Sequence, residues 1–404
     1  MKKLLFPLVI YILWGCCGPQ KVIVLNKHEF DVSCKLVTIE KDLLTLVEQK
    51  LPTITGDDGT AIPSQLVDSD DDGSWDQLIF QVTVKAKSNS EFIVDWVSED
   101  DYPKYPKQTQ VYLGYSESRD NIFRSVDRHT RTKEHLPQKV PYTYQFEGPG
   151  WESNLVAFRS YFDTRNGKDI FGKRTEEMVV HMIGTGENYH SLQSWGMDVL
   201  KVGSSLGAGG LAIFKSDSLL RLGETATAEF VKVQEGPILS SFKLIYKGWD
   251  VLGLNYELQE EIVIQANKRW FQSTVSLSAV DDQSTDTLAV GIVNLKEARV
   301  DQINQAGVQA LYTYGIQSEN KDALGMALFI EDKYFLTTAI APSDGNGITN
   351  SELAYLKPGE GSFIYHFYAG WEMENSKFSS REGFEDALKT TAQELSADLV
   401  INIQ

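Results

Sequence analysis

Short segments with strand-like alternation follow one another through the second half of the chain, and they constrain its fold more than any other feature. In residues 269–278, Phe271, Val275 and Leu277 fall on one face, while Trp270 and polar side chains fall on the other. Turns that contain Gly and Asp separate such segments. This spacing predicts a mostly β fold of stacked antiparallel sheets. The predicted strands are 229–233, 240–246, 257–265, 269–278, 287–294, 325–330, 335–339 and 361–369.

One segment near the end of the chain has a helical pattern instead. Residues 379–382 read Ser-Ser-Arg-Glu, which is a capping sequence, and Phe384, Leu388 and Leu395 recur at helical spacing. A short C-terminal helix is therefore expected, followed by a closing strand at 399–403.

The first residues have the layout of a bacterial lipoprotein signal. An apolar run at 4–14 follows two lysines and is too short to span a bilayer as a helix. Leucine three positions before Cys16, and glycine directly before it, indicate that residues 1–15 are a signal peptide and that Cys16 is lipidated. The sequence thus predicts a protein of the bacterial cell envelope, anchored to the membrane by lipid only. An ordinary secretion signal is the alternative.

Composition narrows the class of protein further. The chain carries 38 Lys and Arg against 56 Asp and Glu, a net charge of −18, without a basic stripe, so no binding to nucleic acid is expected. Three cysteines exclude a disulfide framework, and no Cys and His cluster has zinc spacing.

No internal repeat or linker divides the chain. Residues 16–404 are predicted to form a single large β-domain, with 20–100 as an N-terminal β sub-module.

A polar stretch at 148–174 is the first candidate for a binding site. It begins with a turn that displays Trp151 and Glu152, and residues 156–163 then alternate between an apolar face and a polar one. A solvated strand face seldom collects aromatic rings, so we interpret this group as part of a ligand site. A surface with scattered salt bridges is the alternative. The polar candidates are Arg159, Tyr161, Asp163, Arg165, Asp169, Lys173 and Arg174.

A second stretch, 189–210, is rich in polar, aromatic and glycine residues, as binding loops are. His190 is the natural proton carrier near neutral pH. Trp195 is suited to stacking on a sugar ring, Asp198 to accepting hydroxyl hydrogen bonds, and Lys201 to holding a uronate carboxylate. A structural His190 and a core Trp195 are the alternatives. The glycines at 203–210 match no phosphate-binding motif and are interpreted as tight turns.

An acidic turn between two predicted strands, 62–68 and 78–85, is a candidate calcium-binding loop. Asp68, Asp70, Asp72 and Asp76 stand at positions 1, 3, 5 and 9 of a calcium loop, but position 12 lacks the glutamate of an EF-hand. Calcium is therefore the candidate metal. A hairpin turn with solvated carboxylates is the alternative.

Several of these motifs, in this order, resemble the bacterial domain of unknown function 4861 family, and the resemblance covers most of the chain. It implies a secreted or lipid-anchored protein of a polysaccharide-utilisation system, in the company of enzymes that act on pectin-like, uronate-bearing glycans. It also implies a galactose-mutarotase-like supersandwich fold, but no catalytic residues. The motifs are Asp68 to Asp76, Gly148-Pro149-Gly150-Trp151-Glu152, Arg159 to Arg165, Asp169-Ile170-Phe171-Gly172-Lys173, Tyr189-His190, Trp195 to Gly203 and Ala369-Gly370-Trp371-Glu372.

Together these features predict a lipid-anchored, carbohydrate-active enzyme, either a lyase or a hydrolase, and the alternative is a glycan-binding protein without activity. In a lyase, Arg159 or Lys201 would neutralise the uronate while His190 or Tyr161 moves the proton. A hydrolase would use Glu152 and Asp198 as its carboxylate pair. The expected substrate-binding residues are Trp151, Trp195, Arg165, Asp163, Lys201 and Lys173.

Overall fold

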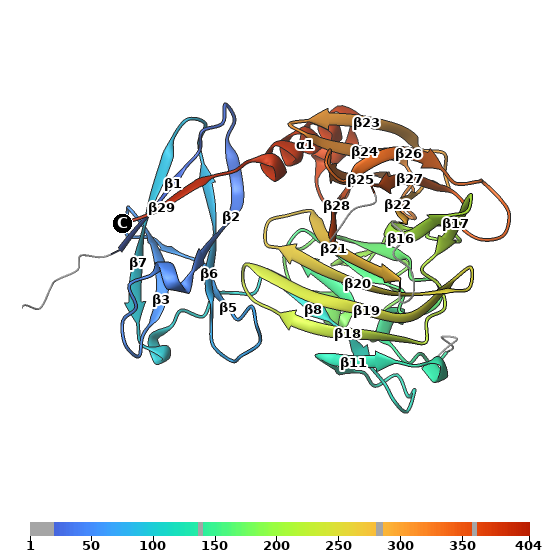
Figure 1. Cartoon of the computed structure of the whole chain (residues 1–404), viewed down its shortest axis with the longest axis horizontal. Helices are drawn as coiled ribbons and strands as arrows, with labels where there is room; N and C mark the ends of the chain where they lie inside the picture. The colour runs from blue at the N-terminus through green and yellow to red at the C-terminus, as the bar shows by residue number, and fades with distance from the viewer. Residues whose placement is uncertain (1–19, 136–139, 280–285, 358–361) are drawn as a thin grey trace, which may run out of the picture.

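The computed structural model describes residues 20–135, 140–279, 286–357 and 362–404. Most of this chain lies in antiparallel strands, and an α-helix follows near the C-terminus (Figure 1). The prediction of stacked antiparallel sheets with a C-terminal helix is confirmed. The predicted signal sequence and Cys16 lie outside the described residues. Within those residues, no helix is both long enough and apolar enough to cross a membrane.

Two small sheets form a unit at the N-terminal end (Figure 1, left). Side chains of both sheets, among them Val22, Val37, Phe80 and Val94, share one buried apolar cluster. The first sheet has the order β29 (Val400–Ile403), β1 (Gln20–Leu25), β7 (Asn89–Val97), β3 (Leu51–Gly56), β4 (Ala61–Ile62). The second has the order β2 (Val32–Glu40), β6 (Gln77–Val84), β5 (Ser64–Val67).

The last strand of the chain completes this N-terminal unit. β29 pairs antiparallel with β1, with Ile403 opposite Val22 (Figure 1). The unit therefore includes residues 400–403, which lie outside the predicted range of 20–100. β5 and β6 pair as the predicted hairpin, with the acidic turn between them.

The larger unit is built on a nine-stranded antiparallel sheet. In β21, Phe271 and Val275 face the main apolar cluster and Trp270 faces the opposite side, which confirms the predicted alternation. The strand order is β11 (Arg128–Arg131), β18 (Thr227–Gln234), β19 (Leu239–Val251), β20 (Leu254–Gln265), β21 (Trp270–Ala279), β28 (Ser362–Trp371), β25 (Ala323–Glu331), β24 (Val308–Ile316), β23 (Arg299–Gln305).

Two five-stranded sheets pack against the nine-stranded sheet through the main apolar cluster. Phe158 of the first contacts Phe271, with ring centroids 4.9 Å apart. The first sheet, which carries the candidate site, has the order β15 (Gly196–Asp198), β14 (Lys168–Lys173), β13 (Val156–Ser160), β12 (Gly150–Ser153), β8 (Thr109–Tyr112). The second is β17 (Ser218–Arg221), β16 (Ala208–Lys215), β22 (Thr287–Val293), β27 (Ser351–Leu356), β26 (Phe335–Ile340), and a short pair joins β9 (Gly114–Tyr115) to β10 (Arg124–Ser125).

The helix α1 (Arg381–Ser396) covers the other face of the nine-stranded sheet. Ser380 caps it by accepting a hydrogen bond from the backbone N–H of Gly383. Phe384 and Leu388 are buried, and Phe384 stacks on Tyr314 of β24 with centroids 5.6 Å apart. Short 3-10 helices are η1 (Lys41–Leu43), η2 (Glu99–Asp101), η3 (Lys133–His135), η4 (Gln145–Glu147), η5 (Val180–Met182) and η6 (Ser376–Ser379).

Candidate functional site

The outer face of the site sheet gathers polar side chains from three neighbouring strands. The inner face of β13 packs Val156 and Phe158 into the core, so its alternation turns Arg159 outward. Arg159 lies directly opposite Asp169 of β14, and Phe171 of β14 lies opposite Asp198 of β15. Strand register thus brings two carboxylates to one guanidinium.

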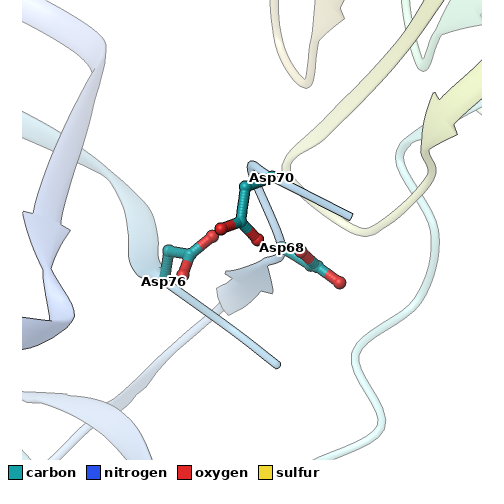
Figure 2. Close-up of side chains that lie close together, drawn as sticks. All are labelled: Asp68, Asp70 and Asp76. Atoms are coloured by element: carbon teal, nitrogen blue, oxygen red, sulfur yellow. The ribbon is translucent and has the colours of Figure 1, made fainter. Parts of the chain in front are cut away.

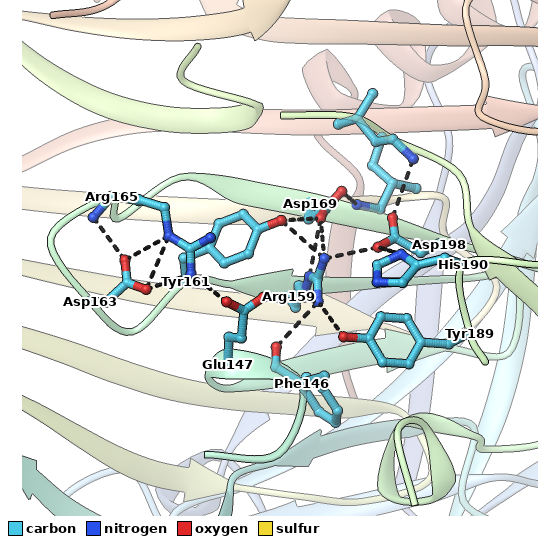
Figure 3. A network of polar contacts seen from close by, with 12 residues as sticks. Phe146, Glu147, Arg159, Tyr161, Asp163, Arg165, Asp169, Tyr189, His190 and Asp198 are labelled. Carbon is cyan, nitrogen blue, oxygen red and sulfur yellow. Dashed lines mark hydrogen bonds and ion pairs between the residues drawn. The ribbon is translucent and has the colours of Figure 1, made fainter. Parts of the chain in front are cut away.

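Arg159 is the centre of a buried network (Figure 3). Its side chain is 2% exposed, and Nη2 donates to the carboxylates of Asp169 at 2.6 Å and Asp198 at 2.8 Å. The Tyr161 hydroxyl donates to Asp169 at 2.7 Å, and Nη1 donates to the carbonyl oxygen of Phe146 at 3.3 Å. Burial, together with the charge of Asp198, raises the pKa of Asp169 to about 6.

This network changes the roles expected for two residues. Arg159 is buried and already forms ion pairs with two carboxylates. The expectation that it binds a substrate carboxylate is therefore wrong. Tyr161 is 8% exposed and its hydroxyl is bound to Asp169, so Tyr161 is not placed to exchange a proton with substrate. Both are positioning residues that hold Asp169 and Asp198 in place.

His190 is the exposed end of the same network. Its Nδ1 lies 3.1 Å from Oδ2 of Asp198, while its side chain is 62% exposed. The hydrogen bond to Asp198 raises the pKa of His190, against the opposing effect of burial. In the neutral imidazole whose Nδ1–H donates to the carboxylate, Nε2 holds a free lone pair, which is the arrangement of an oriented general base.

A cavity of about 340 Å³ opens beside this pair, and we call it the reaction cavity. Lys201 is exposed in its wall, and it has no ion-pair partner among the described residues. The carboxylates in the wall are occupied: Asp198 by Arg159, Glu147 by Arg165, and Glu319 by Lys296. The lining residues are Glu147, Arg159, Tyr161, His190, Asp198, Leu200, Lys201, Val202, Gly203 and Glu319.

Arg165 and Asp163 extend the network at one end. The Nε of Arg165 donates to both carboxylate oxygens of Asp163 at 3.0 Å, and its Nη2 donates to Glu147 at 2.6 Å. The guanidinium lies 4.0 Å from the centroid of the Tyr161 ring and its side chain is 43% exposed. Neither residue lines the reaction cavity, so the structure assigns both to support of Tyr161.

Three other predicted site residues are structural. Trp151 is fully buried between the sheets, where its ring lies 5.2 Å from that of Phe271, so it is not a sugar platform. Glu152 and Lys173 form a buried ion pair at 2.6 Å, and Glu152 also accepts two backbone N–H bonds from the segment that covers it. The predicted hydrolase pair of Glu152 and Asp198 is therefore wrong, because Glu152 does not reach the reaction cavity.

Trp195 lies half-buried in the wall of a second cavity of about 470 Å³, which we call the Trp195 cavity. Tyr189 lines the same cavity, and its ring contacts that of His190 at a tilt of 45°, with ring centroids 4.3 Å apart. The two cavities are therefore adjacent, because Tyr189 lines one and the next residue, His190, lines the other.

The acidic turn brings three of its four predicted ligands together. One carboxylate oxygen each from Asp68, Asp70 and Asp76 lie within 4.8 Å of one another (Figure 2). Asp72 is not part of this group, and its carboxylate accepts a hydrogen bond from the N–H of Ser74 at 2.7 Å. Three oxygens are compatible with calcium, and calcium binding stays a prediction.

Two members of the network, Tyr189 and Glu147, were not among the predicted site residues, and Asp169 was a candidate without an assigned role. Asp169 lies in β14, which is formed by residues 168–173. The Tyr189 hydroxyl accepts from Arg159 at 3.5 Å, and Glu147 binds Arg165. Sequence pattern did not indicate that Asp169 pairs with Arg159, because this pairing depends on the register of β13 with β14.

The fold and this site define a mostly β protein with a buried, arginine-centred polar network under an exposed histidine. Residues 24–401 match the family model described as "Domain of unknown function (DUF4861)", and the chain belongs to this family. It is similar to Uncharacterized protein P7 of Formosa agariphila, with 23% identity over 363 residues that cover 85% of this chain and 82% of the relative.

Two solved structures from Enterococcus faecalis are also similar. One is an α-mannosidase of strain V583, with 9% identity, a TM-score of 0.49 and coverage of 95% of this chain and 46% of that one. The other is a protein in glycosyl hydrolase family 38, with 11% identity, a TM-score of 0.47 and coverage of 96% and 47%. The chain spans a little under half the length of both.

His190 is expected to titrate above the ordinary histidine pKa of 6.5, because Asp198 stabilises the imidazolium. The pair then contributes its full stability below pH 6.5 and loses it as the pH rises through the raised pKa. NMR titration of the imidazole should give this midpoint, and Asp198→Asn should lower it. A midpoint that Asp198→Asn leaves unchanged would show that the two side chains do not interact in solution.

Proposed function

We propose that this protein is a carbohydrate-active lyase of the bacterial cell envelope, anchored by lipid on Cys16, that cleaves uronate-bearing glycans by β-elimination. The observation that carries the proposal is the His190–Asp198 pair: an exposed imidazole, oriented by a buried carboxylate that Arg159 holds, at the mouth of a cavity. The anchor is supported by the sequence before Cys16.

The chemistry requires a base, a cation and a route for the proton. Nε2 of His190 takes the proton from the carbon next to the uronate carboxylate, while Lys201 neutralises that carboxylate and so stabilises the developing negative charge. The bond between the neighbouring carbon and the glycosidic oxygen then breaks as the carbon–carbon double bond forms. The imidazolium returns its proton to the leaving oxygen, so one residue serves as base and then as acid.

Hydrolysis is less well supported by the same cavity. It needs two carboxylates on either side of the scissile bond. Asp198 is held by Arg159 and His190, and the other carboxylates in the wall are occupied by cations. A proton-transfer mechanism uses the site without breaking these ion pairs.

A glycan-binding protein without activity is the second candidate, and the Trp195 cavity favours it. Aromatic rings in a cavity wall are sufficient to hold a sugar without chemistry. The two candidates differ in His190: a binder keeps its affinity in His190→Gln and forms no product from any glycan, whereas the lyase forms an unsaturated product that His190→Gln abolishes.

Lys201→Met is expected to lower the affinity for a uronate oligosaccharide about tenfold, since a charge-assisted hydrogen bond is lost. Isothermal titration calorimetry with that oligosaccharide, and with the same compound after reduction of its carboxylates to alcohols, measures the effect. The reduced compound should bind both forms of the protein equally.

The control for this variant is Lys50→Met, since Lys50 is exposed in the N-terminal unit. It should leave both affinities unchanged. An equal loss of affinity for the acidic and the reduced oligosaccharide in Lys201→Met would contradict the assigned role.

A further inference from the structure

The Trp195 cavity is built with fixed aromatic walls. The ring of Trp195 meets that of Phe171 edge-on, with centroids 6.1 Å apart, and Tyr189 meets the same Phe171 ring edge-on at 6.0 Å. Phe171 is fully buried on β14, so both walls are braced against the site sheet. Rigid rings of this kind stack on the apolar face of a sugar with little loss of conformational entropy.

The charged side chains that have no ion-pair partner among the described residues are negative in the Trp195 cavity and positive in the reaction cavity. The described lining of the Trp195 cavity includes Glu177 and Glu187 but no Lys, Arg or His. Both glutamates are exposed, and neither has an ion-pair partner in the described part of the chain. In the reaction cavity the carboxylates are occupied, and Lys201 has no ion-pair partner among the residues that the structure describes. Free carboxylates repel an acidic sugar and accept hydrogen bonds from the hydroxyls of an uncharged one.

The two cavities adjoin at Tyr189 and His190, which are consecutive in the chain. Tyr189 lines the Trp195 cavity and His190 lines the reaction cavity, and their rings are in contact. The two cavities therefore lie next to each other, as subsites for neighbouring sugars of one glycan chain would.

We infer that the Trp195 cavity is a subsite for a sugar without carboxylate or sulfate, adjacent to the uronate in the reaction cavity. The substrate is accordingly a heteropolymer in which uronate is linked to an uncharged sugar, and not a chain of uronates alone. This inference rests on the proposed function, because the reaction cavity defines where the uronate lies.

The test compares two oligosaccharides of equal length, one of alternating uronate and uncharged sugars and one of uronates only. Binding is measured by calorimetry with His190→Gln protein, and turnover with the unmodified protein. The alternating compound is expected to bind at least about tenfold more tightly. Trp195→Ala should remove this preference by weakening only the alternating compound, since stacking on an aromatic ring is lost. Glu177→Gln combined with Glu187→Gln should strengthen binding of the all-uronate compound.

Trp96→Ala is the matched control, because Trp96 is a half-buried tryptophan of the N-terminal unit. It should change neither affinity. Equal affinity for the two compounds, or an equal loss of both in Trp195→Ala, overturns the inference. If the alternating compound binds more tightly but neither compound is turned over, the result supports the inferred subsite and overturns the proposed lyase activity. Absence of binding to either compound overturns both.

Discussion

Replacing His190 by glutamine is expected to lower kcat on a uronate oligosaccharide by about 10²- to 10⁴-fold, the usual contribution of a general acid–base residue. KM should change little, because Lys201 and Trp195 make the proposed contacts to substrate. The side chain of His190 is 62% exposed, so the fold should tolerate the change. Steady-state kinetics, followed by the absorbance of the unsaturated uronate product, gives both constants.

Thermal unfolding of His190→Gln is the control for this experiment, and His181→Gln is the matched variant. His181 is also exposed, and it does not line the reaction cavity. A midpoint of unfolding close to that of the unmodified protein would assign the loss of activity to chemistry. Undiminished kcat in His190→Gln would contradict the mechanism.

Replacing Arg159 by methionine is expected to lower the free energy of unfolding by about 3–5 kcal/mol, the cost of breaking a buried ion pair by removing one partner. Asp169 and Asp198 would then be buried side by side without a cation. Chemical denaturation, with the midpoint and slope fitted together, measures the loss.

Arg165→Met is the comparison for this variant. Arg165 also binds two carboxylates, but its side chain is 43% exposed, so its loss is expected to cost only about 1 kcal/mol or less. If the two variants were equally stable, the Arg159 network would not be the structural centre of the site. Arg159→Met should also raise the pKa of His190, because the positive charge of the guanidinium, which disfavours the imidazolium, would be removed.

The strand pattern of the sequence predicted the fold class because most strands of the larger unit have one apolar face. Several strands were not predicted, and two of them show why. β23, an edge strand, has polar residues on both faces, and β16 begins with Ala208 and two glycines, in a segment interpreted as tight turns. The pairing of β29 with β1 joins the two ends of the described chain, and no local pattern encodes it.

Alternation around Arg159 correctly separated an apolar face of β13 from a polar one, but local pattern does not tell what covers each face. Trp151 was predicted to bind sugar, whereas the nine-stranded sheet buries it. Glu152 and Lys173 were predicted in the cleft, whereas they neutralise each other beneath the segment that contains η5. The partnership of Asp169 with Arg159 depends on strand register, which an isolated polar residue does not reveal.

The central claim is that the protein cleaves a uronate linkage by β-elimination in the reaction cavity. The most direct test incubates the protein with a heteropolymeric uronate oligosaccharide and follows unsaturated uronate by absorbance and new reducing ends in the same sample. We predict that both rise together with the unmodified protein and that neither rises with His190→Gln. Reducing ends without new absorbance would establish hydrolysis and contradict the account.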